Sequence, residues 1–147
     1  MEAAGTIIPP HAGIVIRRGP SSTAEVVLTG AVKAGQTTAV LTSSGYHFVG
    51  NPYIAALTLA SSGLYTGDPQ TGLQGGSSAG AADQVLLWAG AGYMTYYYNT
   101  DVSGWRTTTD AATDAGATSI PGGAGFVILR REGSRLAWTA PVHPVTP

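Results

Sequence analysis

The sequence predicts an all-β fold, an antiparallel β-sandwich or jelly roll with a duplicated terminal hairpin. Short runs rich in β-branched and aromatic residues recur along the 147 residues, and glycine and proline residues separate them. Many short strands with such turn signals are typical of sandwiches and jelly rolls. A repeat that links the two ends of the chain supplies the duplicated hairpin.

The strands are expected in the following order, each as an apolar or aromatic run between turn residues. Their ranges are 13–18, 24–33, 37–42, 46–49, 84–88, 93–99, 125–131 and 136–139. One helical turn is predicted at 58–62, with Thr58 as N-cap and Gly63 as the residue that ends it. Residues 72–82 read GLQGGSSAGAA, which predicts a mobile loop too rich in glycine and serine to pack.

The internal repeat joins TIIPPHAGIVIRR at 6–18 with TSIPGGAGFVILR at 118–130, and eight of these thirteen aligned positions are identical. Each copy is a Pro/Gly turn followed by an apolar run that ends in arginine. One interpretation is that 1–35 is an N-terminal hairpin segment, the end of a preceding repeat, and that 36–147 is one complete repeat unit. The alternative is a single domain whose first and last strands diverged from a duplicated hairpin.

The charge content narrows the choice of partners. Charged residues make up 10% of the chain, and seven Lys plus Arg nearly balance eight Asp plus Glu. Phosphate binding needs clustered positive charge, so nucleic acid is not an expected partner. No apolar run approaches the roughly 20 residues of a membrane span, so no membrane span is expected. A surface with so little charge does little to oppose self-association, so a homo-oligomer or polymer is an expected state.

Several segments come in an order that resembles a known group of proteins. They are GNPY at 50–53, ADQVLLW at 82–88, GYMTYYY at 92–98, GW at 104–105 and IPGGAGFVILRR at 120–131. This order is similar to a family of uncharacterised secreted, β-rich bacterial proteins of Verrucomicrobia, and to GNPYP…W…IPPGQGFFV segments of Bacteroidetes surface proteins. Ile54 departs from it, because a proline commonly stands there. The resemblance implies export, an extracellular or cell-surface location, a β-sandwich and a repeated module, and it brings no catalytic residues.

No constellation of residues indicates an enzyme. His11, His47 and His143 lie in no recognisable motif, and neither a Gly-x-Ser-x-Gly elbow nor a spaced histidine pair for zinc occurs. The eight carboxylates stand mostly in turns or near strand ends, where solvated turn residues are expected. We therefore predict a protein without catalytic activity and without a resident cofactor.

One metal site has a physical basis. Asn99, Asp101 and Ser103 stand at alternate positions before Gly104, and Asp110 falls at the twelfth position of the same stretch. Calcium prefers such oxygen ligands around a tight glycine turn. The favoured alternative is a hairpin turn, because Asn and Asp before Gly are also common there.

Aromatic residues form a second candidate site. Tyr93, Tyr96 and Tyr98 are expected to share one face of a strand, with Tyr97 on the other, and Trp105 could extend them as a strip. Such a strip could fill the core, lie between subunits or stack against sugar rings.

The sequence thus predicts a structural subunit that self-assembles as a filament, sheath or surface layer through β-strand addition. The expected assembly strand and the stiff hinge before it consist of Ile14, Val15, Ile16, Pro9 and Pro10. The alternative function is a carbohydrate-binding or adhesive module of a larger secreted protein, with polysaccharide as partner.

Overall fold

The computed structural model describes residues 7–8, 11–14, 16 and 35–142. Within these residues all regular structure is β-strand, and every strand ladder is antiparallel. The strands are β1 (Thr37–Leu41), β2 (Gly45–Gly50), β3 (Leu57–Thr58), β4 (Gln84–Trp88), β5 (Tyr93–Asn99), β6 (Gly104–Thr107), β7 (Ser119–Ile120), β8 (Gly125–Arg130) and β9 (Leu136–Ala140). The predicted all-β fold is therefore confirmed.

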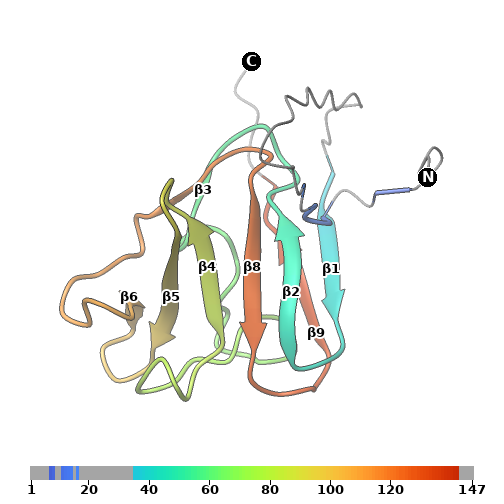
Figure 1. The fold of residues 1–147 in the computed structure, drawn as a ribbon. Helices are drawn as coiled ribbons and strands as arrows, with labels where there is room; N and C mark the ends of the chain where they lie inside the picture. The colour runs from blue at the N-terminus through green and yellow to red at the C-terminus, as the bar shows by residue number, and fades with distance from the viewer. Residues whose placement is uncertain (1–6, 9–10, 15, 17–34, 143–147) are drawn as a thin grey trace.

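The largest sheet has five strands in the order β2-β8-β4-β5-β6 (Figure 1). β2 lies at one edge of this sheet and β6 at the other. Two further two-stranded sheets, β1-β9 and β3-β7, join distant parts of the chain. β1 pairs with β9 through Leu41 opposite Leu136 and Thr37 opposite Ala140, so the last strand is held by the first strand of the described main body.

Pairing register assigns the two faces of the large sheet. Val85 on β4 lies opposite Tyr96 on β5 and Ile128 on β8. Val49 on β2 lies opposite Phe126 on β8. Because side chains alternate along a strand, these residues share one face, and all of them are buried. This face carries the core.

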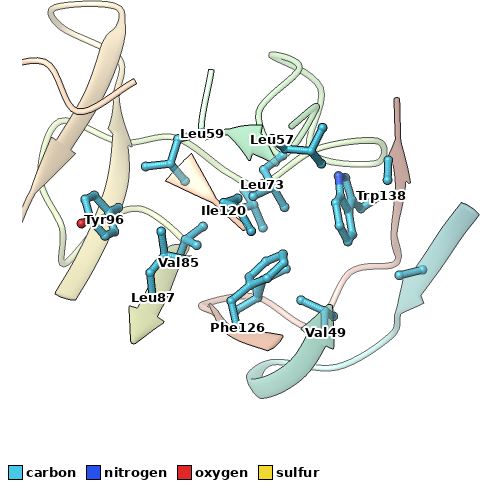
Figure 2. Close-up of a cluster of buried hydrophobic side chains, with 14 of the residues drawn as sticks. Val49, Leu57, Leu59, Leu73, Val85, Leu87, Tyr96, Ile120, Phe126 and Trp138 are labelled. Carbon is cyan, nitrogen blue, oxygen red and sulfur yellow. The ribbon is translucent and has the colours of Figure 1, made fainter. Parts of the chain in front are cut away.

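The core lies between the large sheet and a second layer of short strands and loops. In Figure 2 the side chains of Val49, Val85 and Phe126 point from the sheet towards the second layer. That layer supplies buried apolar residues, which are Leu57, Leu59, Leu73, Ile120 and Trp138. Trp138 also donates its indole N–H to the Ser62 carbonyl at 2.9 Å, so its polar atom is satisfied inside the core. Two layers closing over one core make a sandwich-like arrangement.

Six of the eight expected strands occur where the sequence predicts them. The other two are the ranges 24–33 and 13–18. The range 24–33 lies outside the described residues. In the range 13–18, the described residues form no strand, and only the adjoining Ala12 makes a β-bridge, to Val49. The duplicated hairpin and the division at residue 35 therefore stay predictions. The expected turn at 58–62 is present without a helix: Thr58 Oγ1 accepts the Ser61 amide at 3.1 Å, and Gly63 has φ of +67°.

The prediction that residues 72–82 would not pack is wrong. Gly76 forms a parallel bridge with Asn99, with its amide donating to the Tyr98 carbonyl at 3.1 Å. Leu73 and Ala82 are buried. Glycine is what makes the packing close, because a Cβ at Gly76 would come within 2.9 Å of the Ala81 carbonyl carbon. In a solvated linker, a composition rich in glycine and serine makes the backbone flexible. In this segment the same composition allows backbone segments to pack closely against each other.

A buried ion pair ties this segment to the large sheet. Asp83 Oδ2 lies 3.6 Å from Arg130 Nε, and both side chains are only 1% exposed. Asp83 also accepts the Arg131 amide at 2.7 Å and the Gln74 amide at 3.1 Å. Arg130 donates to the Leu41 carbonyl at 3.2 Å and to the Ser134 carbonyl. One carboxylate and one guanidinium therefore connect four separate parts of the backbone.

Candidate functional site

The outer edge of β2 binds a segment of the chain's own N-terminal region. Ala12 forms an antiparallel bridge with Val49, the Gly50 amide donates to the His11 carbonyl at 2.9 Å, and the Gly13 amide donates to the Phe48 carbonyl at 3.3 Å. This contact lies on the side of β2 opposite to β8 (Figure 1). The edge is therefore able to accept an added strand.

Gly13 makes this contact possible. A Cβ at Gly13 would come within 2.7 Å of the Val49 carbonyl oxygen, so the two backbones are closer than any other residue type allows. Of the predicted assembly residues, Ile14 and Ile16 are 43% and 57% exposed and belong to no strand. Pro9, Pro10 and Val15 lie outside the described residues. The structure thus brings residues 11–13, which directly precede the predicted assembly strand, to a sheet edge.

The GNPY and IPGG segments form one turn unit, which sequence reasoning did not find. The Asn51 side-chain amide donates to the Ala55 carbonyl at 2.9 Å and to the Ile120 carbonyl at 3.2 Å. The Gly123 amide donates to the Tyr53 carbonyl at 2.9 Å. The Tyr53 hydroxyl donates to the Ala140 carbonyl on β9 at 2.9 Å, which locks the unit to the second sheet layer. Two motifs that are some 70 residues apart in sequence therefore form one turn unit.

Glycine is required at two positions of this turn unit. A Cβ at Gly122 would overlap the Ile54 carbonyl, and Gly123 has φ of +69°, in the left-handed region that favours glycine. In the N-terminal copy of the repeat, Pro10 and His11 stand at the corresponding positions. The N-terminal copy therefore cannot form the same turn against a GNPY segment.

The outer face of the large sheet carries large aromatic side chains. Tyr46 and Phe48 on β2 are 65% and 50% exposed, and Trp88 and Tyr93 at the β4–β5 turn are 60% and 50% exposed. Trp88 and Tyr93 form an edge-to-face pair with ring centroids 5.2 Å apart. The register places Val127 between Phe48 and Leu86 on this same face. Exposed apolar surface of this kind marks interaction sites.

The predicted strip of Tyr93, Tyr96, Tyr98 and Trp105 is wrong in its first member. Side chains alternate along β5, so Tyr93 shares the outer face with Tyr97, while Tyr96 and Tyr98 point into the other face. Tyr96 and Trp105 are buried in the core, and Tyr98 packs against it. The strip is therefore divided between the two faces of the sheet.

Tyr98 belongs instead to an aromatic cluster that includes Tyr65, a residue the sequence did not single out. The Tyr65 and Tyr98 rings stack with centroids 3.5 Å apart and 11° between their planes, and Trp105 meets Tyr98 edge-on at 5.8 Å. A concavity of about 290 Å³ is lined by all three rings together with Ser103 and Asp114. A second concavity, of about 390 Å³, shares Tyr65. Tyr65 lies outside any strand, so no periodic pattern could have indicated it.

The predicted calcium ligands are distributed over two turns. Asn99, Asp101 and Ser103 belong to the β5–β6 hairpin, where Asn99 Oδ1 accepts the Asp101 amide at 2.9 Å and Ser103 has φ of +48°. Asp110 lies in the next turn, where its Oδ1 accepts the Thr113 amide at 3.1 Å. The hairpin alternative is confirmed. Among the described residues, no group of three or more His, Asp or Glu side chains is placed to hold a metal ion. Calcium binding by these residues stays a prediction.

Comparisons with known proteins add no relative. No protein-family model matches the chain, and neither the curated proteins nor the solved structures contain a match to it. The resemblance to secreted bacterial proteins therefore stays a prediction. In the part of the chain that the structure describes, no helix is long and apolar enough to cross a membrane.

Proposed function

We propose that this chain is a non-catalytic structural subunit that self-assembles outside the cell by β-strand addition at the edge of β2. The observation that carries the proposal is the pairing of residues 11–13 with β2, through two main-chain hydrogen bonds of 2.9 and 3.3 Å. An edge whose N–H and C=O groups fit a segment of its own chain also fits the same segment from a neighbouring copy. The proposal is that neighbouring copies exchange this segment.

The register of the contact defines the exchanged strand. Extending the Ala12–Val49 bridge antiparallel along β2 places Ile14 opposite His47 and Ile16 opposite Gly45. Within one chain the described ladder ends at Gly13, and both isoleucines remain exposed. A full strand in a neighbouring copy would add main-chain hydrogen bonds and bury these apolar side chains.

The turn chemistry distinguishes two modes of strand exchange. The N-terminal copy of the repeat could replace β8 of a neighbour, or it could add beside β2. Replacement requires the Gly122–Gly123 turn, and the N-terminal copy has Pro10 and His11 there. Addition at the open edge needs only Gly13, which is present. We therefore propose edge addition and not replacement of β8.

Chain length permits the exchange. Residues 17–36 connect the segment to β1. An extended connection of 20 residues spans at most about 70 Å. This reach is several times the spacing of about 4.8 Å between neighbouring strands. A head-to-tail contact whose rotation does not close into a ring generates fibres, and we propose this mode of assembly.

Three further features support an assembling subunit outside the cell. The outer face with Tyr46, Phe48, Trp88 and Tyr93 offers apolar surface that an assembly would cover. The chain has 10% charged residues, so charge repulsion between copies is weak. The resemblance to secreted proteins supports the extracellular location.

Light scattering after size exclusion, combined with negative-stain microscopy, tests the proposal. We expect the full chain to form long regular particles. A variant without residues 1–20 should remain monomeric, with an unchanged β-type circular dichroism spectrum. Assembly that persists unchanged in this variant would contradict strand addition.

A matched pair of substitutions makes the test specific to the edge. Gly13→Val places side-chain atoms against the Val49 carbonyl and should abolish assembly. Gly35→Val changes a glycine whose Cβ position has no atom within 4 Å, so it should assemble as the parent does. Equal behaviour of the two variants would show that the β2 edge is not the contact.

A further inference from the structure

The aromatic cluster around Tyr65 has the parts of a ligand site, and no residue of β2 lines it. We propose that the two concavities that share Tyr65 bind consecutive rings of a neutral polysaccharide. None of the side chains that line these concavities is on β2, so either proposal can fail without the other.

The walls of the first concavity are rigid aromatic rings. Tyr65 stacks on Tyr98, and Trp105, which is 3% exposed, fixes Tyr98 from its edge. Sugar rings present apolar C–H faces, which pack against aromatic surfaces, while their hydroxyl groups need hydrogen-bonding partners. Ligand sites combine such apolar walls with a few fixed polar groups. The cluster provides the walls in a preformed arrangement.

Asp114 is the fixed polar group. Its Oδ1 accepts Arg106 Nη1 at 3.0 Å and its Oδ2 accepts the Gly116 amide at 3.3 Å, while 62% of the side chain stays exposed. An ionised carboxylate has about four acceptor positions, so capacity remains for hydroxyl donors of a sugar. Because Arg106 already compensates the charge, the site favours neutral donors over a free cation.

Two glycines keep the Asp114 carboxylate accessible. A Cβ at Gly104 would come within 2.9 Å of Asp114 Oδ1, and a Cβ at Gly116 would come within 3.0 Å of Oδ2. Any side chain at either position would press on the carboxylate oxygens. The backbone at these glycines therefore packs against Asp114 without covering it, and a ligand can approach the exposed part of its side chain.

The second concavity indicates a chain of sugars and not a single ring. It shares Tyr65 with the first and is lined further by Gln74, Thr100 and Glu132. Its volume of about 390 Å³ and the 290 Å³ of the first are near the lower end of small-molecule pockets, about 300–1,000 Å³. Two small polar-aromatic hollows joined by one tyrosine fit adjacent units of a linear glycan. Asp114 and Glu132 would repel an acidic glycan.

Affinity electrophoresis tests the proposal in gels that contain soluble β-glucan, xylan, mannan or starch, with alginate as the acidic comparison. The full chain carries Gly13→Val in every sample, so that it stays unassembled and enters the gel. We expect retardation by at least one neutral glycan and none by alginate. Tyr65→Ala and Asp114→Asn should each weaken retention by about tenfold, which corresponds to about 1.4 kcal/mol. Tyr65→Phe keeps the ring and should retain binding. An unchanged circular dichroism spectrum of Tyr65→Ala distinguishes loss of the site from loss of the fold.

Tyr93→Ala is the matched control, because this tyrosine is half exposed on the opposite face of β5. It should leave retention unchanged. Absence of retardation by every neutral glycan would overturn the proposal. So would retention that Tyr93→Ala removes and that Tyr65→Ala and Asp114→Asn leave intact, because the glycan would then lie on the outer sheet face.

Discussion

Replacing Asp83 by alanine should destabilise the fold more than any change of a surface charge. The substitution leaves the Arg130 guanidinium, 1% exposed, without its carboxylate. It also removes the acceptor of the Arg131 and Gln74 amides. Breaking a buried ion pair from one side costs about 3–5 kcal/mol, against a total stability of about 5–15 kcal/mol for a domain. At about 2–4 °C per kcal/mol, the melting temperature should fall by roughly 6–20 °C.

Urea unfolding followed by tryptophan fluorescence measures this cost, because Trp105 and Trp138 are buried and become exposed when the chain unfolds. Asp101→Ala is the control, since this aspartate is exposed in the β5–β6 turn. It should unfold within about 0.5 kcal/mol of the parent. If Asp83→Ala costs less than about 1 kcal/mol, the range of an exposed pair, the ion pair is not a structural link and the reasoning is refuted.

Three further predictions concern the core, the turn unit and pH. Trp138→Phe removes the hydrogen bond to the buried Ser62 carbonyl and should cost about 1–3 kcal/mol in thermal unfolding; an unchanged melting temperature would contradict the assigned bond. Gly122→Ala forces a Cβ into a neighbouring carbonyl and should cost at least about 1–3 kcal/mol in urea, which an unshifted midpoint would disprove. Hydrogen bonds, led by that from Thr113, lower the pKa of Asp110 below 3.8, so its small contribution to stability is complete above that pH and disappears as the pH falls through the lowered pKa. Carboxyl titration by NMR checks this, and a midpoint at or above 3.8 would contradict it.

The strands that sequence analysis predicted are longer than the strands that it missed. β4, β5 and β8 have five to seven residues, most of them apolar or aromatic, and are long enough for their composition to indicate a strand. Three strands were missed. β6 has four residues, GWRT, of which Trp105 alone is large and apolar. β3 and β7 have two residues each, and they pair only because the turn unit brings Leu57 opposite Ile120. No local pattern can indicate a strand that tertiary contacts create.

The candidate sites also differ in whether a local sequence pattern indicates them. The repeat directed attention to Ile14 and Ile16, and the structure places the neighbouring Ala12 at a sheet edge. Tyr65 and Asp114 were not foreseen, because they meet only when two loops fold over the β5–β6 hairpin. The composition of residues 72–82 predicted a mobile loop, since glycine content does not distinguish a solvated linker from a backbone packed at close range.

Pairwise cysteine cross-linking tests the central claim most directly, because the chain has no cysteine of its own. Ile14→Cys and His47→Cys occupy opposed positions in the proposed register, in a non-hydrogen-bonded pair with Cα atoms about 4.5 Å apart, within the range of a disulfide. The two single variants are mixed, allowed to assemble and oxidised. We predict a covalent Ile14→Cys–His47→Cys heterodimer, and none when Asp101→Cys replaces His47→Cys. Assembled particles in which the Ile14→Cys and His47→Cys variants fail to cross-link would contradict strand addition at β2.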